Sequence, residues 1–394
     1  MIKLNEIKEN YLEILVIFFG SLLSFYFPVL YNLRVFDFVS FAILLFLVNQ
    51  RKNNIYIGNT IKSFFLLFTI FIVLSFLVSI LNKAVEIHLP RIIGTFFAII
   101  FSILFYGYFK NRVSKLIIGI KYTIYIHAIF FYIQFLLFFL LKQYVDFIKP
   151  ITGNVSRNIG GSFNLDSAIR SSGLYSEPAS YSLFILSLMS AYILYKKRID
   201  LIDFIVLFSV ILSASASGTV YLIAFIFVYF IIYSNTALTK KVYFASLVTL
   251  GAFFFIGLDY IKVDYLFEKI INFEDSGSYQ YRIGNTNEVL SELTDLQQYF
   301  GVGYANMDIK GDKGSTYSAL FIEHGYILGG FFMVIILSFF ISHHIKIPIL
   351  FYVLLLFMGT HTYAQIQFWI WILSIAIIST NLYNNERKNL QVIT

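Results

Sequence analysis

The sequence has little of what a water-soluble domain needs. It has no cysteine, so it can form neither a disulfide bond nor a thiolate metal site. Only 13% of its 394 residues are charged, against roughly 25% in soluble domains, which excludes a globular fold with a charged surface. Its five prolines argue against a disordered or loop-rich chain.

Hydrophobic residues make up 59% of the chain and gather in long runs. A membrane-spanning helix needs about 20 mainly apolar residues, and backbone inside lipid must be hydrogen-bonded internally. The sequence therefore predicts an all-α, polytopic integral membrane protein, with residues 1–394 forming a single membrane domain of about twelve spans. The predicted spans are 11–30, 35–49, 63–81, 91–109, 116–141, 179–195, 201–215, 217–234, 242–258, 317–342, 347–360 and 366–382.

Lysine and arginine indicate the orientation, because they are enriched in cytoplasmic loops. With the N-terminus inside, most of them fall on the inside, and the short outside loops hold only Arg34, Lys83 and Arg91. We therefore expect both termini to be cytoplasmic. The net charge of +7 then reflects anchoring charges, and no basic tail of the kind that binds nucleic acid is present.

Two connections are much longer than the others, 142–178 and 259–316, and both fall on the outer, extracytoplasmic side. Each is too short to bury a full core alone. We expect both loops to pack against the outer end of the helix bundle. The chain has no internal repeat.

The first long loop ends in a group of residues suited to chemistry on a phosphate. Pro178 fits the first turn of a helix, which Ser176 or Glu177 can cap. Gly173 permits a sharp turn that could bring Arg170 back toward Glu177. Arg170 is suited to bidentate phosphate binding and Glu177 to general-base catalysis. The alternative is a structural ion pair between these two residues.

The second long loop contains one predicted amphipathic helix. Its apolar residues recur at helical spacing, with Asn285 as a possible cap and Gly301 as the end: Val289, Leu293, Leu296 and Phe300. Arg282 lies just before this helix, as a candidate ligand or simply a solvated charge. The following turn, Gly301-Val302-Gly303-Tyr304, allows close backbone approach, but it lacks the pattern of a nucleotide-binding phosphate loop.

Glu323 and His324 lie inside the tenth predicted span. Ionisable groups within a bilayer are costly and face a cavity or a partner, so Glu323 is either functional or bonded to a neighbouring helix. Neither HExxH nor an Asp-x-Asp pair in the outer loops is present, and no metal site is predicted. The other histidines are interpreted as structural pairs, His127 with Gln134 and His361 with Gln365, or as cytoplasmic anchors, His343 and His344.

Taken in order along these spans, the motifs resemble the O-antigen and capsule repeat-unit polymerases of the Wzy type. That family belongs with the O-antigen ligases in a wider superfamily. The resemblance covers the whole chain through its spans and two outer loops. Its sharpest parts are Arg170-x-x-Gly173-x-x-x-Glu177-Pro178, Arg282 ahead of Gly301-Val302-Gly303-Tyr304, and Glu323-x-Gly325.

The resemblance implies a GT-C-like glycosyltransferase that moves a growing glycan from undecaprenyl diphosphate onto a lipid-linked repeat unit. Charge grows on the leaving diphosphate and needs a cationic grip, for which Arg170 and Arg282 are the candidates, with Gly173 and Tyr304 completing the substrate-binding set. Glu177 is the first candidate for the base, and Glu323 or His324 the second. The scheme requires no metal and no cofactor.

The same resemblance places the protein in the bacterial cytoplasmic (inner) membrane, with the lipid-linked oligosaccharide and membrane lipid as its small-molecule partners. A separate chain-length regulator is the expected protein partner. An O-antigen ligase is one alternative, but ligases carry a histidine where this chain has Gly314, ahead of Tyr317. A lipid-linked oligosaccharide flippase is the other, although transporters are usually built from repeats.

Overall fold

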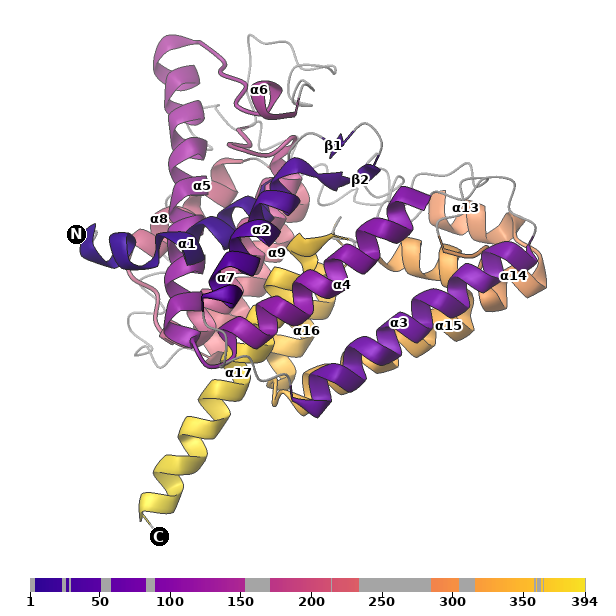
Figure 1. Ribbon diagram of the computed structural model, residues 1–394. Helices are drawn as coiled ribbons and strands as arrows, with labels where there is room; N and C mark the ends of the chain where they lie inside the picture. The colour runs from indigo at the N-terminus through magenta and orange to yellow at the C-terminus, as the bar shows by residue number, and fades with distance from the viewer. Residues whose placement is uncertain are drawn as a thin grey trace. The chain divides into compact units, whose positions relative to one another are not determined.

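The computed structural model describes residues 4–22, 26–27, 30–50, 58–82, 89–152, 171–213, 215–233, 285–304, 316–357, 359, 363 and 365–393. Within these ranges the chain is almost wholly helical (Figure 1). It divides into two compact units, treated separately below. Unit 1 comprises Met1–Phe25, Arg34–Ile43 and Ser114–Phe273, and unit 2 comprises Tyr26–Leu33, Leu44–Val113 and Glu274–Thr394.

The architecture is that of an all-α polytopic membrane protein. Among the described residues, six helices are long and apolar enough to cross a membrane: Asn59–Leu81, Arg91–Phe109, Val113–Leu141, Pro178–Lys196, Leu320–Ser342 and Ile366–Asn389. Each coincides with a predicted span. Shorter apolar helices occupy further predicted spans, at Val35–Asn49, Leu201–Leu212, Ser217–Tyr229 and Ile347–Leu356. The span predicted at 242–258 lies outside the described residues.

The first predicted span, 11–30, is wrong in its C-terminal part. Helix α1 runs over Leu4–Ser21, and the chain then forms two short paired strands, β1 (Tyr26–Phe27) and β2 (Leu30–Arg34), before α2 (Val35–Asn49). The sequence explains the difference. Pro28 has no backbone N–H and disfavours helical geometry in the residue before it, so an apolar run of sufficient length does not continue as helix.

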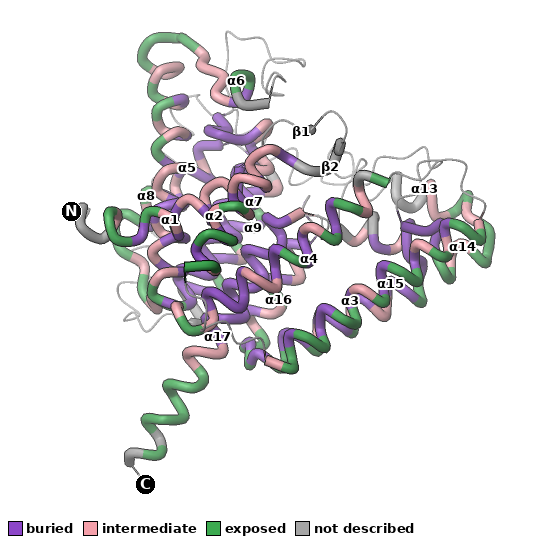
Figure 2. The backbone as a smooth tube through the Cα atoms, viewed as in Figure 1, coloured by how far each residue is buried: buried purple, intermediate pink, exposed green. Residues whose placement is uncertain are grey.

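Unit 1 is organised around a nearly buried helix, α7 (Pro178–Lys196). It packs against α8 (Leu201–Leu212), α9 (Ala216–Phe225) and the π-helix η1 (Ile226–Tyr233), and Figure 2 shows how little of it is exposed. Gly218 allows the close approach of α9, because a Cβ there would lie 2.5 Å from Cβ of Ser182. Helices α5 (Val113–Leu141) and α6 (Lys149–Thr152) precede it in the chain.

Unit 2 contains two long helix pairs. Helix α3 (Asn59–Leu81) packs along α15 (Thr316–Ser342), and α4 (Leu89–Phe109) packs along α17 (Ile366–Ile393). Helix α16 (Ile347–Leu356) connects α15 to α17 in the chain. Aromatic rings fill the interior, with Phe68 of α3 against both Phe332 of α15 and Trp369 of α17. Dispersion forces and the burial of apolar surface therefore stabilise the helices that carry the polar residues.

The amphipathic stretch of the second long loop forms two helices, and the prediction of one helix is wrong. Helix α13 covers Asn285–Glu292 and α14 covers Asp295–Phe300. The break has a local cause: Thr294 adopts an extended conformation and forms a capping box with Gln297, the arrangement that starts a new helix. Gly301 ends α14 with φ +80°, as predicted.

Candidate functional site

The residues with the clearest functional signals in unit 2 meet where the Gly301–Tyr304 turn contacts α15. Gly325 has φ +65° and interrupts that helix, so carbonyl groups just before it need other partners. The turn supplies them: the N–H of Val302 donates to the carbonyl of Ile322 at 3.1 Å, and the N–H of Gly303 donates to that of Glu323 at 2.9 Å. Two motifs apart in the sequence thus form one structure.

Three glycines make this contact possible, and each has a left-handed backbone: Gly301 (φ +80°), Gly303 (φ +100°) and Gly325 (φ +65°). A Cβ atom on Gly301 would overlap the carbonyl of Glu323, and one on Gly325 would overlap the backbone of Gly301. Glycine is therefore required both by conformation and by space. The expectation that this turn allows close backbone approach is confirmed.

Helix α3 holds the other side of the turn. The N–H of Tyr304 donates to the carbonyl of Ser75 at 3.1 Å, and the Ser79 hydroxyl donates to the carbonyl of Tyr304 at 2.9 Å. The amide of Asn82 donates to the carbonyl of Gly301 at 3.1 Å. The turn is thus held between α3 and α15, which fixes the position of the Tyr304 ring.

The charged centre of this site is a bidentate ion pair between Arg91 of α4 and Glu323 of α15. The two nitrogens Nη1 and Nη2 of Arg91 donate to Oε1 and Oε2 of Glu323 at 2.5 and 2.9 Å. The Arg91 guanidinium also lies over the ring of Tyr304, 4.8 Å from its centroid. The Glu323 side chain is fully buried, whereas that of Arg91 keeps 17% of its surface exposed. The interpretation of Glu323 as bonded to a neighbouring helix is confirmed.

A chain of hydrogen bonds leads from His324 to the same carboxylate. The Tyr363 hydroxyl donates to Oε2 of Glu323 at 3.0 Å and lies 2.6 Å from Nε2 of His324. Because this hydroxyl donates its hydrogen bond to the carboxylate, it can only accept one from His324. Nε2 of His324 is therefore the protonated nitrogen, and Nδ1 accepts from the Ser75 hydroxyl at 2.5 Å. Burial raises the pKa of Tyr363 well above its ordinary value and keeps this donor protonated.

Tyr304 completes the site beside the Arg91 guanidinium. Its hydroxyl is hydrogen-bonded to the Thr95 hydroxyl, one turn along α4 from Arg91. Its ring stacks on that of His324, with centroids 5.9 Å apart. Burial raises its pKa, so the phenol stays neutral. Tyr304 therefore contacts both the cation and the histidine of the site without adding a charge.

In unit 1, the first-loop motif forms a turn held by a glutamine. The N–H of Tyr175 donates to the carbonyl of Ser172 at 3.1 Å, and Gly173 between them has φ +58°, as the predicted sharp turn requires. Gln134 of α5 accepts from the N–H groups of Ser172 and Gly173 at 2.8 and 3.0 Å and donates to the carbonyl of Val145 at 2.8 Å. Gln134 thus ties together both ends of this loop.

Glu177 occupies the position predicted for it, at the N-terminal cap of α7 with Pro178 as the next residue. Its side chain makes no capping hydrogen bond but accepts one from the Ser180 hydroxyl at 3.1 Å, and it is half-buried. The Glu177 carboxylate is therefore only partly shielded from solvent. Arg170 and Arg282 lie outside the described residues.

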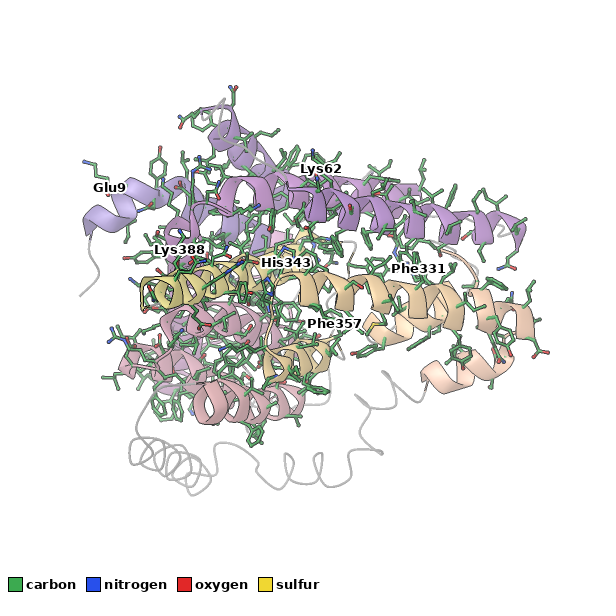
Figure 3. All side chains as sticks on the ribbon, turned by 90° about the horizontal axis from the view of Figure 1, so that it is seen from below. Glu9, Lys62, Phe331, His343, Phe357 and Lys388 are labelled. Carbon is green, nitrogen blue, oxygen red and sulfur yellow. The ribbon has the colours of Figure 1, made fainter. Side chains whose placement is uncertain are left out.

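The other histidines have mixed outcomes. His127 is buried in unit 1, its Nε2 2.9 Å from the Ser21 hydroxyl and its ring beside that of Tyr175, which agrees with a structural role. The interpretation of His343 as an anchor is wrong: its side chain, labelled in Figure 3, is buried just after α15. Its Nε2 lies 3.1 Å from the hydroxyl of Tyr106. His344 is exposed and stacks on another ring. His361 lies outside the described residues.

Sequence reasoning missed the partners that complete the site, Arg91, Tyr363 and Ser75. Arg91 was counted only as a loop charge, although a basic residue at the start of one span and an acidic residue inside another are natural partners. No local spacing singles out Tyr363 or Ser75. Among the described residues, no group of three or more His, Asp or Glu side chains could hold a metal ion.

Comparison of the chain with protein-family models, with curated proteins and with solved structures finds no match. The described residues that could take part in a function are an arginine with a partly exposed side chain in unit 2, Arg91, and a half-buried carboxylate in unit 1, Glu177.

Proposed function

We propose that this protein is a membrane-embedded glycosyltransferase that polymerises lipid-linked glycan repeat units. It would transfer a growing glycan from undecaprenyl diphosphate onto the next lipid-linked unit. One observation carries the proposal: the Gly301–Tyr304 turn and the Glu323-x-Gly325 motif, on which the resemblance to the Wzy-type polymerases partly depends, pack directly on each other. Glycines at left-handed positions explain why these motifs need those residues.

The chemistry assigns a role to each candidate residue. Arg170 and Arg282 would hold the leaving diphosphate, where negative charge grows. Glu177 is the better candidate for the base, because it is only half-buried and lies at the N-terminal end of α7. Glu323 and His324 are fully buried and hydrogen-bonded within the site, so we assign them to positioning rather than to proton transfer with the acceptor sugar.

The polyprenyl chain of such a substrate needs an apolar surface. Helix α3 offers one, with exposed leucines along its length: Leu66, Leu67, Leu74, Leu77 and Leu81. The proposed setting is the bacterial cytoplasmic membrane, with both termini cytoplasmic, both long loops outside, a GT-C-like fold and a separate chain-length regulator as partner. Polymerisation on the outer face would need no nucleotide.

The test is a gel profile of surface glycan from cells that lack the gene. A single repeat unit attached to its acceptor, with the ladder gone, is the expected result. Loss of all attached glycan with lipid-linked polymer accumulating would indicate a ligase, and single units trapped on the cytoplasmic face would indicate a flippase. Either result would overturn the proposal.

Complementation refines the test. Arg170→Ala and Arg282→Ala should fail to restore the ladder although the protein accumulates in the membrane. Arg387→Ala is the matched control, because Arg387 is an exposed arginine near the C-terminal end of α17. A normal ladder from both loop variants would remove the diphosphate-binding role of these arginines.

A further inference from the structure

Burying the Arg91–Glu323 pair in an apolar helix bundle has a large free-energy cost. Removing both charges from water costs several kcal/mol per ion, and a well-packed apolar pair is often as stable or more so. Ionisable groups at such positions are functional by default. Helix α15 is already packed along α3, with Phe71 and Phe332 at 5.2 Å between ring centroids, so the pair is not needed to hold α15 against α3.

The two side chains of the pair differ in their exposure to solvent. Three donors converge on the Glu323 carboxylate, two nitrogens of Arg91 and the Tyr363 hydroxyl, and its side chain has no exposed surface. Arg91 keeps 17% of its side-chain surface exposed. A guanidinium carries five N–H groups, and the pair uses two of its nitrogens. Of the two members of the pair, only Arg91 therefore reaches the surface.

We propose that Arg91 binds a phosphate group, and that Glu323 is a positioning residue that holds the guanidinium for this purpose. The guanidinium lies over the Tyr304 ring. Because it carries five N–H groups, it can donate to phosphate oxygens while Nη1 and Nη2 remain bonded to Glu323. Arg91 also lies in the first turn of α4, where unpaired N–H groups favour an anion. On the proposed function, which this inference deepens, the phosphate belongs to the lipid-linked glycan.

The experiment uses full-length protein in phosphatidylcholine nanodiscs, with inorganic pyrophosphate as the probe and calorimetry as the readout. The key variant is Arg91→Met combined with Glu323→Leu, which removes both charges and leaves no unpaired ion. We expect it to remain folded, with pyrophosphate affinity reduced at least tenfold. Wild-type affinity in this folded variant would overturn the proposal.

Two single variants test geometry against charge. Arg91→Lys keeps the cation and its attraction to Glu323 but loses the planar fork, so affinity should fall several-fold. The matched control is Arg112→Lys. Arg112 follows the same helix, lies over the ring of Tyr108 at 4.6 Å and donates to the carbonyl of Tyr108 rather than to a carboxylate. Equal affinity for Arg91→Lys and Arg112→Lys would contradict phosphate binding by the fork.

Two further experiments are needed. The first distinguishes a substrate phosphate from a lipid headgroup, and the second tests the phosphate site separately from the proposed polymerisation. Pyrophosphate binding should survive in nanodiscs containing phosphatidylglycerol; its loss there would assign the site to bilayer headgroups and overturn the substrate role. In cells, a normal ladder with Arg91→Lys beside a lost ladder on deletion would refute the inference and leave polymerisation standing. A normal ladder on deletion, with pyrophosphate binding intact, would refute polymerisation and leave the phosphate site standing.

Discussion

Replacing Gly303 by alanine tests the packing of the Gly301–Tyr304 turn most directly. Gly303 has φ +100°, and an L-residue with such a backbone is strained by about 1–3 kcal/mol. Its new Cβ would also overlap the backbone N and Cα of Ser79 in α3. Overpacking of this kind costs roughly 1–3 kcal/mol, and here backbone rather than a flexible side chain must move.

The combined destabilisation is about 2–6 kcal/mol, a large part of the roughly 5–15 kcal/mol that holds a typical protein folded. The matched control is Gly330→Ala: Gly330 lies in α15, and a Cβ there would have no neighbour within 4 Å. Alanine inside a helix gains about 0.5–1 kcal/mol over glycine. The assay is the thermal unfolding midpoint of the purified protein in detergent, with the glycan ladder as a second readout.

We expect Gly303→Ala to melt well below wild type and Gly330→Ala to melt at or slightly above it. Equal midpoints for the two variants would show that the turn is not held against α3 as described. A lowered midpoint with an unchanged ladder would keep the packing argument and separate the turn from activity.

Three further predictions concern individual side chains of the two units. Tyr363→Phe removes the donor to Glu323 and the acceptor of His324 and should lower stability by about 1–3 kcal/mol; an unchanged melting midpoint would contradict the assigned chain. Gln134→Ala should loosen the first long loop by a similar amount, seen as faster hydrogen exchange at Ser172 and Gly173, and unaltered exchange there would refute the tie. Glu177→Gln should abolish polymer while leaving the melting midpoint near wild type, and full activity would move the base elsewhere.

The membrane architecture was largely predictable, because span length and apolarity are local properties of the sequence. The exceptions were local too: α1 ends at Ser21, ahead of Pro28, and the Thr294 capping box divides the amphipathic stretch. A hydrophobic pattern alone does not show such ends, because turn and cap residues decide them.

The site was predictable only in pieces. Glu323, Tyr304 and the glycines stand out by residue type, whereas their contact depends on tertiary packing. Arg91 and Glu323 are 232 residues apart, and no periodicity connects them. Arg91 fits the pattern of a topological charge at the end of a span. Its second role, as the partner of Glu323, becomes visible only in the structure.

That separation has a consequence for how the protein is made. At roughly 5–20 residues per second, the ribosome adds Glu323 about 10–50 s after Arg91. Throughout that interval the helix beginning at Leu89 has a guanidinium near its first turn with no carboxylate to meet it. The side chain of an unpaired arginine at the end of a helix can extend to the lipid headgroups. Arg91 can therefore keep its charge solvated at the lipid surface until Glu323 is made. The ion pair can therefore close only after α15 has been made, so its formation marks the arrival of that helix.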